Sequence, residues 1–114
     1  MDPGRRIFTL HDDLVKAILI ATSPYGIFWR NITGTYKTLD GKRVVSCGLE
    51  GTPDVVGFQN ETGLWFGFEA KIGHDKLSPK QIQFHKIAKQ RGARIFEIRD
   101  PYQCVEILKK ESRP

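Results

Sequence analysis

The stretch "EGTPDVVGFQNETGLWFGFEAKIG", residues 50–73, contains two apolar runs on either side of a short polar segment. The runs "DVVGF" and "LWFGFEAK" have the aliphatic and aromatic content of strands, and residues 60–63 are turn formers. The pattern therefore predicts a β-hairpin. Asp54 opens the first run, and Glu69 and Lys71 close the second. Antiparallel pairing would bring all three charged residues to the same end of the hairpin.

Alternation along the second predicted strand places Glu69 and Lys71 on one face, about 7 Å apart between Cα atoms. Asp54 would lie beside them. Two neighbouring carboxylates repel each other, and burying them is costly unless a positive charge intervenes. Lys71 could supply that charge, and a divalent cation such as magnesium would do so better, with the Ala70 carbonyl as a third ligand. The alternative is a surface hairpin end with an ordinary Lys–Glu pair, because a similar triplet, Asp-Gly-Lys, also occurs at residues 40–42.

The first half of the chain predicts a helix followed by extended segments. Residues 9–23 have helical apolar spacing, and Thr9 could cap this helix with Asp12 three residues later. Asp40-Gly41 predicts a two-residue hairpin turn between "TYKTL" and "KRVVSC".

The second half predicts a helix over residues 78–92. Ser78 is suited to the N-cap, Pro79 to the first helical position and Gln81 to the third, and Gly92 ends the pattern. A strand at 93–100 and a helix at 101–110 follow. The expected fold is α/β, with a small mixed sheet flanked by helices in the order α-β-β-β-α-β-α, in one domain over residues 9–110.

Composition limits the class of protein. The 114 residues suffice for one domain with its own core, and residues 1–8 are expected to form a flexible N-terminal arm. The longest apolar run, residues 17–21, is far too short to span a bilayer, and no signal-peptide pattern is visible. Cys47 and Cys104 make neither a disulfide framework nor a zinc site, so a reducing, intracellular compartment is expected. Eighteen Lys and Arg against 13 Asp and Glu give a net charge of +5, which permits a polyanionic partner.

The motifs "GTPD", "FEAK" and "LSPKQ", together with "FWRNITG" at residues 28–34, resemble the virus-type replication–repair nuclease (VRR-NUC) domain. That family lies within the PD-(D/E)xK restriction-endonuclease-like superfamily. The resemblance covers most of residues 9–108 and implies a restriction-endonuclease-like core. The matching positions are Gly51, Pro53, Asp54, Glu69, Lys71 and Gln81.

The resemblance implies a DNA endonuclease that uses Mg²⁺ or Mn²⁺. Asp54, Glu69 and the Ala70 carbonyl would hold the metal, which polarises the scissile phosphate and activates water. Lys71 would orient that water and offset developing charge. Gln81 would hydrogen-bond to the water, the phosphate or Lys71, although the capping box alone also accounts for a glutamine at this position.

Further residues are assigned by position. Relatives often carry a glutamate in the first helix near the metal, and Asp12 or Asp13 is the candidate here. The histidines at positions 11, 74 and 85 have no ligand spacing among themselves and receive no role. The expected DNA contacts are Arg5, Arg6, Arg30, Lys76 and Lys80.

The expected substrate is branched DNA such as a four-way junction, because small stand-alone relatives resemble Holliday-junction resolvases. Two matched cuts in a two-fold symmetric junction predict a homodimer. The alternatives are a flap, nicking or restriction-type nuclease, and a non-catalytic nucleic-acid-binding module with the same fold. The expected location is the cytoplasm, of the host cell if the protein is phage- or prophage-encoded.

Overall fold

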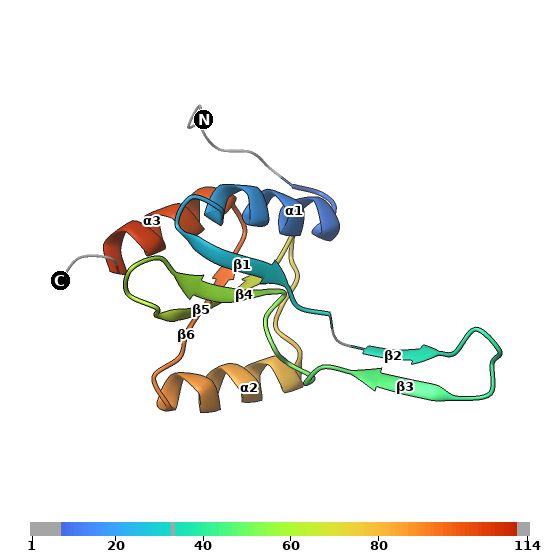
Figure 1. Cartoon of the computed structure of the whole chain (residues 1–114). Coiled ribbons are helices and arrows are strands. Elements are labelled where there is room, and N and C mark those ends of the chain that lie inside the picture. Colours follow the sequence, from blue (N-terminus) through green and yellow to red (C-terminus); the bar gives the residue numbers. More distant parts are fainter. Residues whose placement is uncertain (1–7, 33, 112–114) are drawn as a thin grey trace.

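The computed structural model describes residues 8–32 and 34–111. In this part of the chain no helix is both long enough and apolar enough to cross a membrane. The elements are α1 (His11–Thr22), β1 (Gly26–Arg30), β2 (Gly34–Lys37), β3 (Val44–Cys47), β4 (Val55–Gln59), β5 (Trp65–Ala70), α2 (Pro79–Gln90), β6 (Arg94–Ile98) and α3 (Pro101–Glu111). Figure 1 shows these helices and strands in chain order, with five strands among the described residues between α1 and α2.

The main sheet has the strand order β1-β4-β5-β6 and is mixed. Strands β1, β4 and β5 are antiparallel neighbours, whereas β6 runs parallel to β5 after the crossover through α2. Val55 pairs with Phe68, and the Gly63 N–H donates to the Gln59 carbonyl at 3.0 Å, so the hairpin predicted from residues 50–73 is confirmed. The mixed sheet with three helices agrees with the predicted α/β class. The predicted order α-β-β-β-α-β-α differs from the structure, because β2 and β3 add a hairpin of their own between β1 and β4.

Helices cover both faces of this sheet. Helices α1 and α3 lie side by side on one face, and α2 lies on the other (Figure 1). The even-numbered residues of β5 point toward α1 and α3, where the rings of Phe66 and Phe68 stack with centroids 6.1 Å apart. Leu14 and Ile18 of α1 complete this core and are fully buried. The opposite face of β5 carries Glu69, and the alternation expected from the sequence is therefore present.

Strands β2 and β3 form a separate two-stranded sheet that extends away from the body (Figure 1). The predicted hairpin is confirmed, but the prediction that its loop has two residues is wrong. Thr38 and Arg43 still close the ladder, since the Thr38 N–H donates to the Arg43 carbonyl at 3.0 Å, so residues 39–42 form the loop. Gly41, with a φ of 70°, takes the left-handed position of this turn.

The start of α1 differs from the prediction. Leu10, not Thr9, is the N-cap residue, and no side chain caps this helix end. The Asp12 carboxylate instead binds Arg30 and Lys16, which draws it away from the helix terminus. A tertiary ion pair has thus replaced the local capping box.

Helix α2 begins as predicted. The Ser78 hydroxyl accepts from the Gln81 N–H at 3.2 Å, and the Ser78 N–H donates to Gln81 Oε1 at 2.8 Å. Pro79 occupies the first turn, and Gly92 follows the last turn with a φ of 93°. Both ends of α2 are therefore set by local sequence, which fixes where its side chains meet the sheet.

Candidate functional site

The loop before β4 brings Asp54 to the end of the sheet nearest α2. Gly51 has a φ of 88°, and a Cβ atom there would lie 2.5 Å from the Lys80 carbonyl oxygen. Only glycine allows the chain to pass this close to the first turn of α2. Pro53 is fully buried and packs over Gly67, where a Cβ atom would lie 2.7 Å from the proline ring. The glycine and proline of "GTPD" therefore shape the approach to Asp54.

Asp54 is held by backbone groups from two neighbouring strands. Its Oδ2 accepts from the Ala70 N–H at 2.9 Å, and its main-chain carbonyl accepts from the Asn31 N–H at 2.7 Å. Because Val55 pairs with Phe68, Asp54 lies beside Glu69. The Ala70 carbonyl points to the same side of β5 as the Ala70 N–H, as in any extended strand. Asp54, Glu69 and this carbonyl therefore converge.

Glu69 is almost completely buried, with 1% of its surface exposed. Its Oε1 accepts from Gln81 Nε2 at 3.0 Å, and its Oε2 lies 3.2 Å from His85 Nε2. Burial and the neighbouring carboxylate of Asp54 raise the pKa of Glu69 to about 9. The protein thus holds an acid in a position that is unfavourable for its ionised form unless a cation is near.

Lys71 lies at the end of β5 with only 9% of its surface exposed. Its ammonium group donates to Gln81 Oε1 at 2.9 Å and to the Lys76 carbonyl at 3.2 Å. Within residues 8–32 and 34–111, no carboxylate forms an ion pair with this ammonium group. The geometry therefore differs from the ordinary Lys–Glu pair that the sequence left open. An amide and a carbonyl hold the buried ammonium in place.

Gln81 links the two halves of the site. Its Oε1 accepts from both the Ser78 N–H and Lys71 Nζ, while its Nε2 donates to Glu69 Oε1. The sequence left two explanations for this residue, a capping box and a role in the site. In the structure the same side chain makes both sets of contacts. The start of α2 is thereby tied to the charged end of β5.

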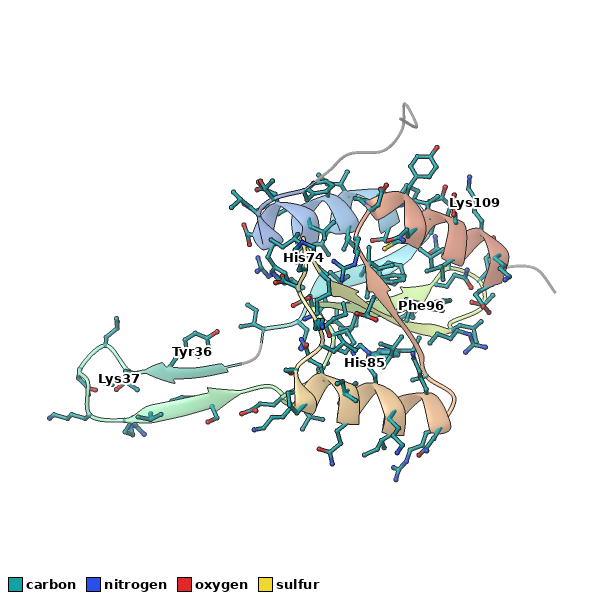
Figure 2. All side chains as sticks on the ribbon, turned by 180° about the vertical axis from the view of Figure 1, so that it is seen from behind. Tyr36, Lys37, His74, His85, Phe96 and Lys109 are labelled. Atoms are coloured by element: carbon teal, nitrogen blue, oxygen red, sulfur yellow. The ribbon has the colours of Figure 1, made fainter. Side chains whose placement is uncertain are left out.

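Two histidines that received no role from the sequence contact the acids. His85 follows Gln81 by one helical turn on α2 and points toward the sheet, where it meets Glu69 (Figure 2). Burial is the main reason that the pKa of His85 lies below its usual range. His11 Nε2, at the start of α1, lies 3.2 Å from Asp54 Oδ2. The i, i+4 spacing of Gln81 and His85 was a usable signal, because such residues share a helix face.

Arg99 is a third residue that the sequence did not point to. Its guanidinium donates to the carbonyls of Gly73 and Asp75, at 2.8 and 2.9 Å. These contacts shape the loop after β5, and the next carbonyl in that loop, from Lys76, accepts from Lys71. Arg99 therefore supports the position of the lysine from the end of β6.

The aspartates expected near the metal site make other contacts. Asp12 is exposed and binds Arg30 and Lys16, and the first of these contacts is the main cause that holds the pKa of Asp12 below its usual range. Asp13 is exposed as well. The residue of α1 that reaches Asp54 is His11.

The residues expected to contact DNA are spread over several elements. Lys80 pairs with Glu50, which offsets part of its charge, and Lys76 is exposed in the loop after β5. Arg30 pairs with Asp12 and lines a hollow next to Asp54. Arg5 and Arg6 lie outside the described residues.

The oxygen donors of the site suit a hard divalent cation. In the described part of the chain, no three His, Cys, Asp or Glu side chains are arranged to hold a metal ion. Asp54, Glu69 and the Ala70 carbonyl nevertheless supply three oxygen donors, and Mg²⁺ ordinarily takes one or two carboxylates and completes its shell with water. Two adjoining carboxylates with little compensating charge fit such an ion.

Comparison with models of protein families and with curated proteins gives no match to this chain.

Proposed function

We propose that this protein is a metal-dependent endonuclease that hydrolyses phosphodiester bonds in DNA. The observation that carries this proposal is the convergence of two carboxylates, a buried lysine and a glutamine at one end of the sheet, with the ammonium group held 2.9 Å from the glutamine oxygen. This residue set, and the order of its motifs, is what the VRR-NUC resemblance implies. The three-helix mixed sheet is compatible with a restriction-endonuclease-like core.

Each side chain has a task in this proposal. Asp54 and Glu69, with the Ala70 carbonyl, hold Mg²⁺ or Mn²⁺, which when bound polarises the phosphate and lowers the pKa of its water. Lys71 orients the attacking water and offsets negative charge that develops on the phosphoryl group. Gln81 keeps the Lys71 ammonium and the Glu69 carboxylate in fixed positions from opposite ends of its amide.

The proposed substrate is branched DNA, with a four-way junction as the first candidate, and the proposed location is the cytoplasm. A two-fold symmetric junction needs two sites, so we propose a homodimer. An apolar patch suited to a second copy of the chain lies on β1 and β4, on the part of the sheet face that α2 leaves uncovered. It consists of Ile27, Trp29 and Phe58. The rings of Trp29 and Phe58 are in edge-to-face contact, with their centroids 6.3 Å apart.

The test is cleavage of a panel of labelled DNAs: duplex, single strand, 5′ and 3′ flaps, a splayed fork and a four-way junction. Each is incubated with Mg²⁺, with Mn²⁺ and with EDTA. We expect metal-dependent cuts that are strongest on the junction. The Lys71→Ala variant, purified in parallel, controls for contaminating nucleases.

The panel also separates the alternatives. Cleavage confined to flaps or plain duplex would replace the junction substrate with a flap-type or restriction-type one. Tight DNA binding without cleavage under any metal condition would contradict the nuclease and leave a nucleic-acid-binding module.

A further inference from the structure

An open, polar hollow of about 360 Å³ lies between Asp54 and the β2–β3 hairpin. Besides Asp54 it is lined by Arg30 at the end of β1, by Asn31 and Ile32 in the segment that follows, and by Tyr36 on β2. Figure 2 shows Tyr36 on this extended hairpin, outside the body of the sheet. The hollow therefore shares Asp54 with the carboxylate pair and extends from it to the hairpin.

Asn31 is the residue in this hollow whose bonding is incomplete. Its backbone N–H donates to the Asp54 carbonyl, which fixes the residue beside the site. Its side-chain Nδ2 is buried, yet it has no hydrogen-bond partner among the residues that the structure describes. A buried donor without an acceptor is costly, and such a group is completed by ordered water, an ion or a ligand. Here the missing partner is an acceptor.

The other polar groups around the hollow favour the same kind of ligand. The Arg30 guanidinium and the Tyr36 hydroxyl are also donors, so the hollow presents three donor groups beside one carboxylate. A phosphodiester supplies the matching acceptor oxygens. Tyr36 is 49% exposed, and its ring is available for stacking on a base.

The hairpin that carries Tyr36 is suited to nucleic acid as a whole. It bears Lys37, Lys42 and Arg43 against one acid, Asp40, and all four are exposed. It pairs with no strand of the main sheet. A lone two-stranded hairpin is only marginally stable in water, so a bound partner would stabilise it, and such a ribbon fits the major groove of DNA.

We infer that this hollow is the binding subsite for the nucleotide that flanks the scissile phosphate. Asn31 Nδ2 donates to a non-bridging oxygen of the flanking phosphate, and the Tyr36 ring stacks on an unpaired base next to the cut. The inference rests on the proposed nuclease function and deepens it. It assigns the preference for branched or unpaired DNA to Tyr36 and Asn31 and not to the carboxylate pair.

The first test measures binding without cleavage. The DNA that the parent protein cuts best is labelled with fluorescein, and its affinity is measured by anisotropy in EDTA. Asn31→Asp should weaken binding about tenfold or more, because the donor becomes an acceptor that repels the phosphate. Asn60→Asp is the matched control, since it makes the same charge change in the β4–β5 turn and should bind like the parent. Asn31→Asp with the affinity of Asn60→Asp would overturn the inference.

Tyr36 is tested in the same assay. Tyr36→Ala should weaken binding to branched DNA about tenfold and binding to intact duplex much less, because only an unpaired base can stack. Tyr36→Phe keeps the ring and removes only the hydroxyl donor, so it should keep the preference for branched DNA over duplex even where its overall affinity falls. Tyr102→Ala removes a similarly exposed tyrosine from α3 and is the control. Equal losses on branched DNA and duplex would contradict the stacking role.

The second test probes the same contact from the side of the DNA. Methylphosphonates are introduced one at a time at the phosphates around the cut, which removes their charge. A methylphosphonate at a phosphate next to the cut should lower the affinity of the parent protein. The same methylphosphonate should not lower the affinity of Asn31→Asp any further, because this variant has already lost the contact. If no methylphosphonate position affects the parent and Asn31→Asp differently, the subsite is refuted, even if the parent cleaves DNA. A parent that neither binds nor cleaves any DNA would instead refute the proposed function.

Discussion

The two acids of the site differ sharply in their surroundings. Asp54 keeps about a quarter of its side chain exposed, whereas Glu69 is enclosed by Gln81 and His85. Their adjacency is destabilising for the folded protein, because the burial and repulsion that raise the pKa of Glu69 both act on the ionised pair. Groups kept in such an unfavourable arrangement are candidates for function.

The first prediction concerns this pair. Asp54→Asn and Glu69→Gln should each abolish most DNA cleavage, because each removes a carboxylate ligand. Each should leave the thermal unfolding temperature unchanged or raise it, because each relieves repulsion between the acids. Cleavage assays and differential scanning fluorimetry check both parts. Either variant with the activity of the parent would refute the metal-site assignment.

Lys71 is the second decisive residue, because its ammonium is held by neutral oxygens and not by a carboxylate. Lys71→Ala should reduce cleavage at least about a hundredfold, the usual cost of losing a group at a developing charge. Binding of Mn²⁺, measured by calorimetry, and binding of DNA in Ca²⁺ should be nearly unchanged. Lost metal binding would indicate that the lysine only maintains the structure of the site.

At the scale of the element, the residues that start α2 also position side chains of the site. Its first turn is closed by Ser78 and Gln81, and the same glutamine reaches Lys71 and Glu69 on β5. His85 adds a second contact one turn later. The helix start thus determines where the amide lies relative to the strand.

Two variants separate capping from the role in the site. Ser78→Ala should cost about 1 kcal/mol of unfolding free energy through the lost cap and leave cleavage nearly unchanged. Gln81→Ala should cost a similar amount and also reduce cleavage at least tenfold, because Lys71 and Glu69 lose their common partner. Urea unfolding and cleavage rates measure the two effects. Equal losses of cleavage in both variants would mean that Gln81 acts through the cap alone.

At the scale of the whole molecule, one half of a sheet face remains uncovered. Helix α2 packs over the β6 side, while the patch of Ile27, Trp29 and Phe58 on β1 and β4 is exposed. Phe66 and Phe68 of β5, by contrast, are fully buried. Because β1 is an edge strand, the patch is accessible to a second copy.

The dimer prediction is tested at this patch. The parent should have the mass of a dimer in light scattering and convert a cruciform plasmid directly to the linear form. Ile27→Glu should give a monomer that accumulates nicked circles, because a buried charge opposes association. Ile20→Glu, which places the same charge at an exposed position of α1, is the control. A monomeric parent that only nicks would refute the resolvase model.

Local patterns correctly predicted the parts of the fold that local physics controls. The alternation along β5, the turn at residues 60–63 and both ends of α2 depend on neighbours within a few residues, and all agree with the structure. The convergence of Asp54 with Glu69 followed from hairpin pairing alone. The capping of α1 by Thr9 was wrong because Arg30, 18 residues from Asp12, competed for its carboxylate.

What the sequence by itself determined is therefore the register of the β4–β5 hairpin, which brings the acids together, and the start of α2, which places Gln81 beside them. Only the tertiary structure decided which side chains complete the site. His85 and His11 reach it from two helices, Arg99 supports the loop whose carbonyl binds Lys71, and Lys71 is held by an amide from α2. The physical reason is range: a register or a cap is set by bonds between near neighbours, whereas these contacts depend on how whole helices pack and rotate against the sheet.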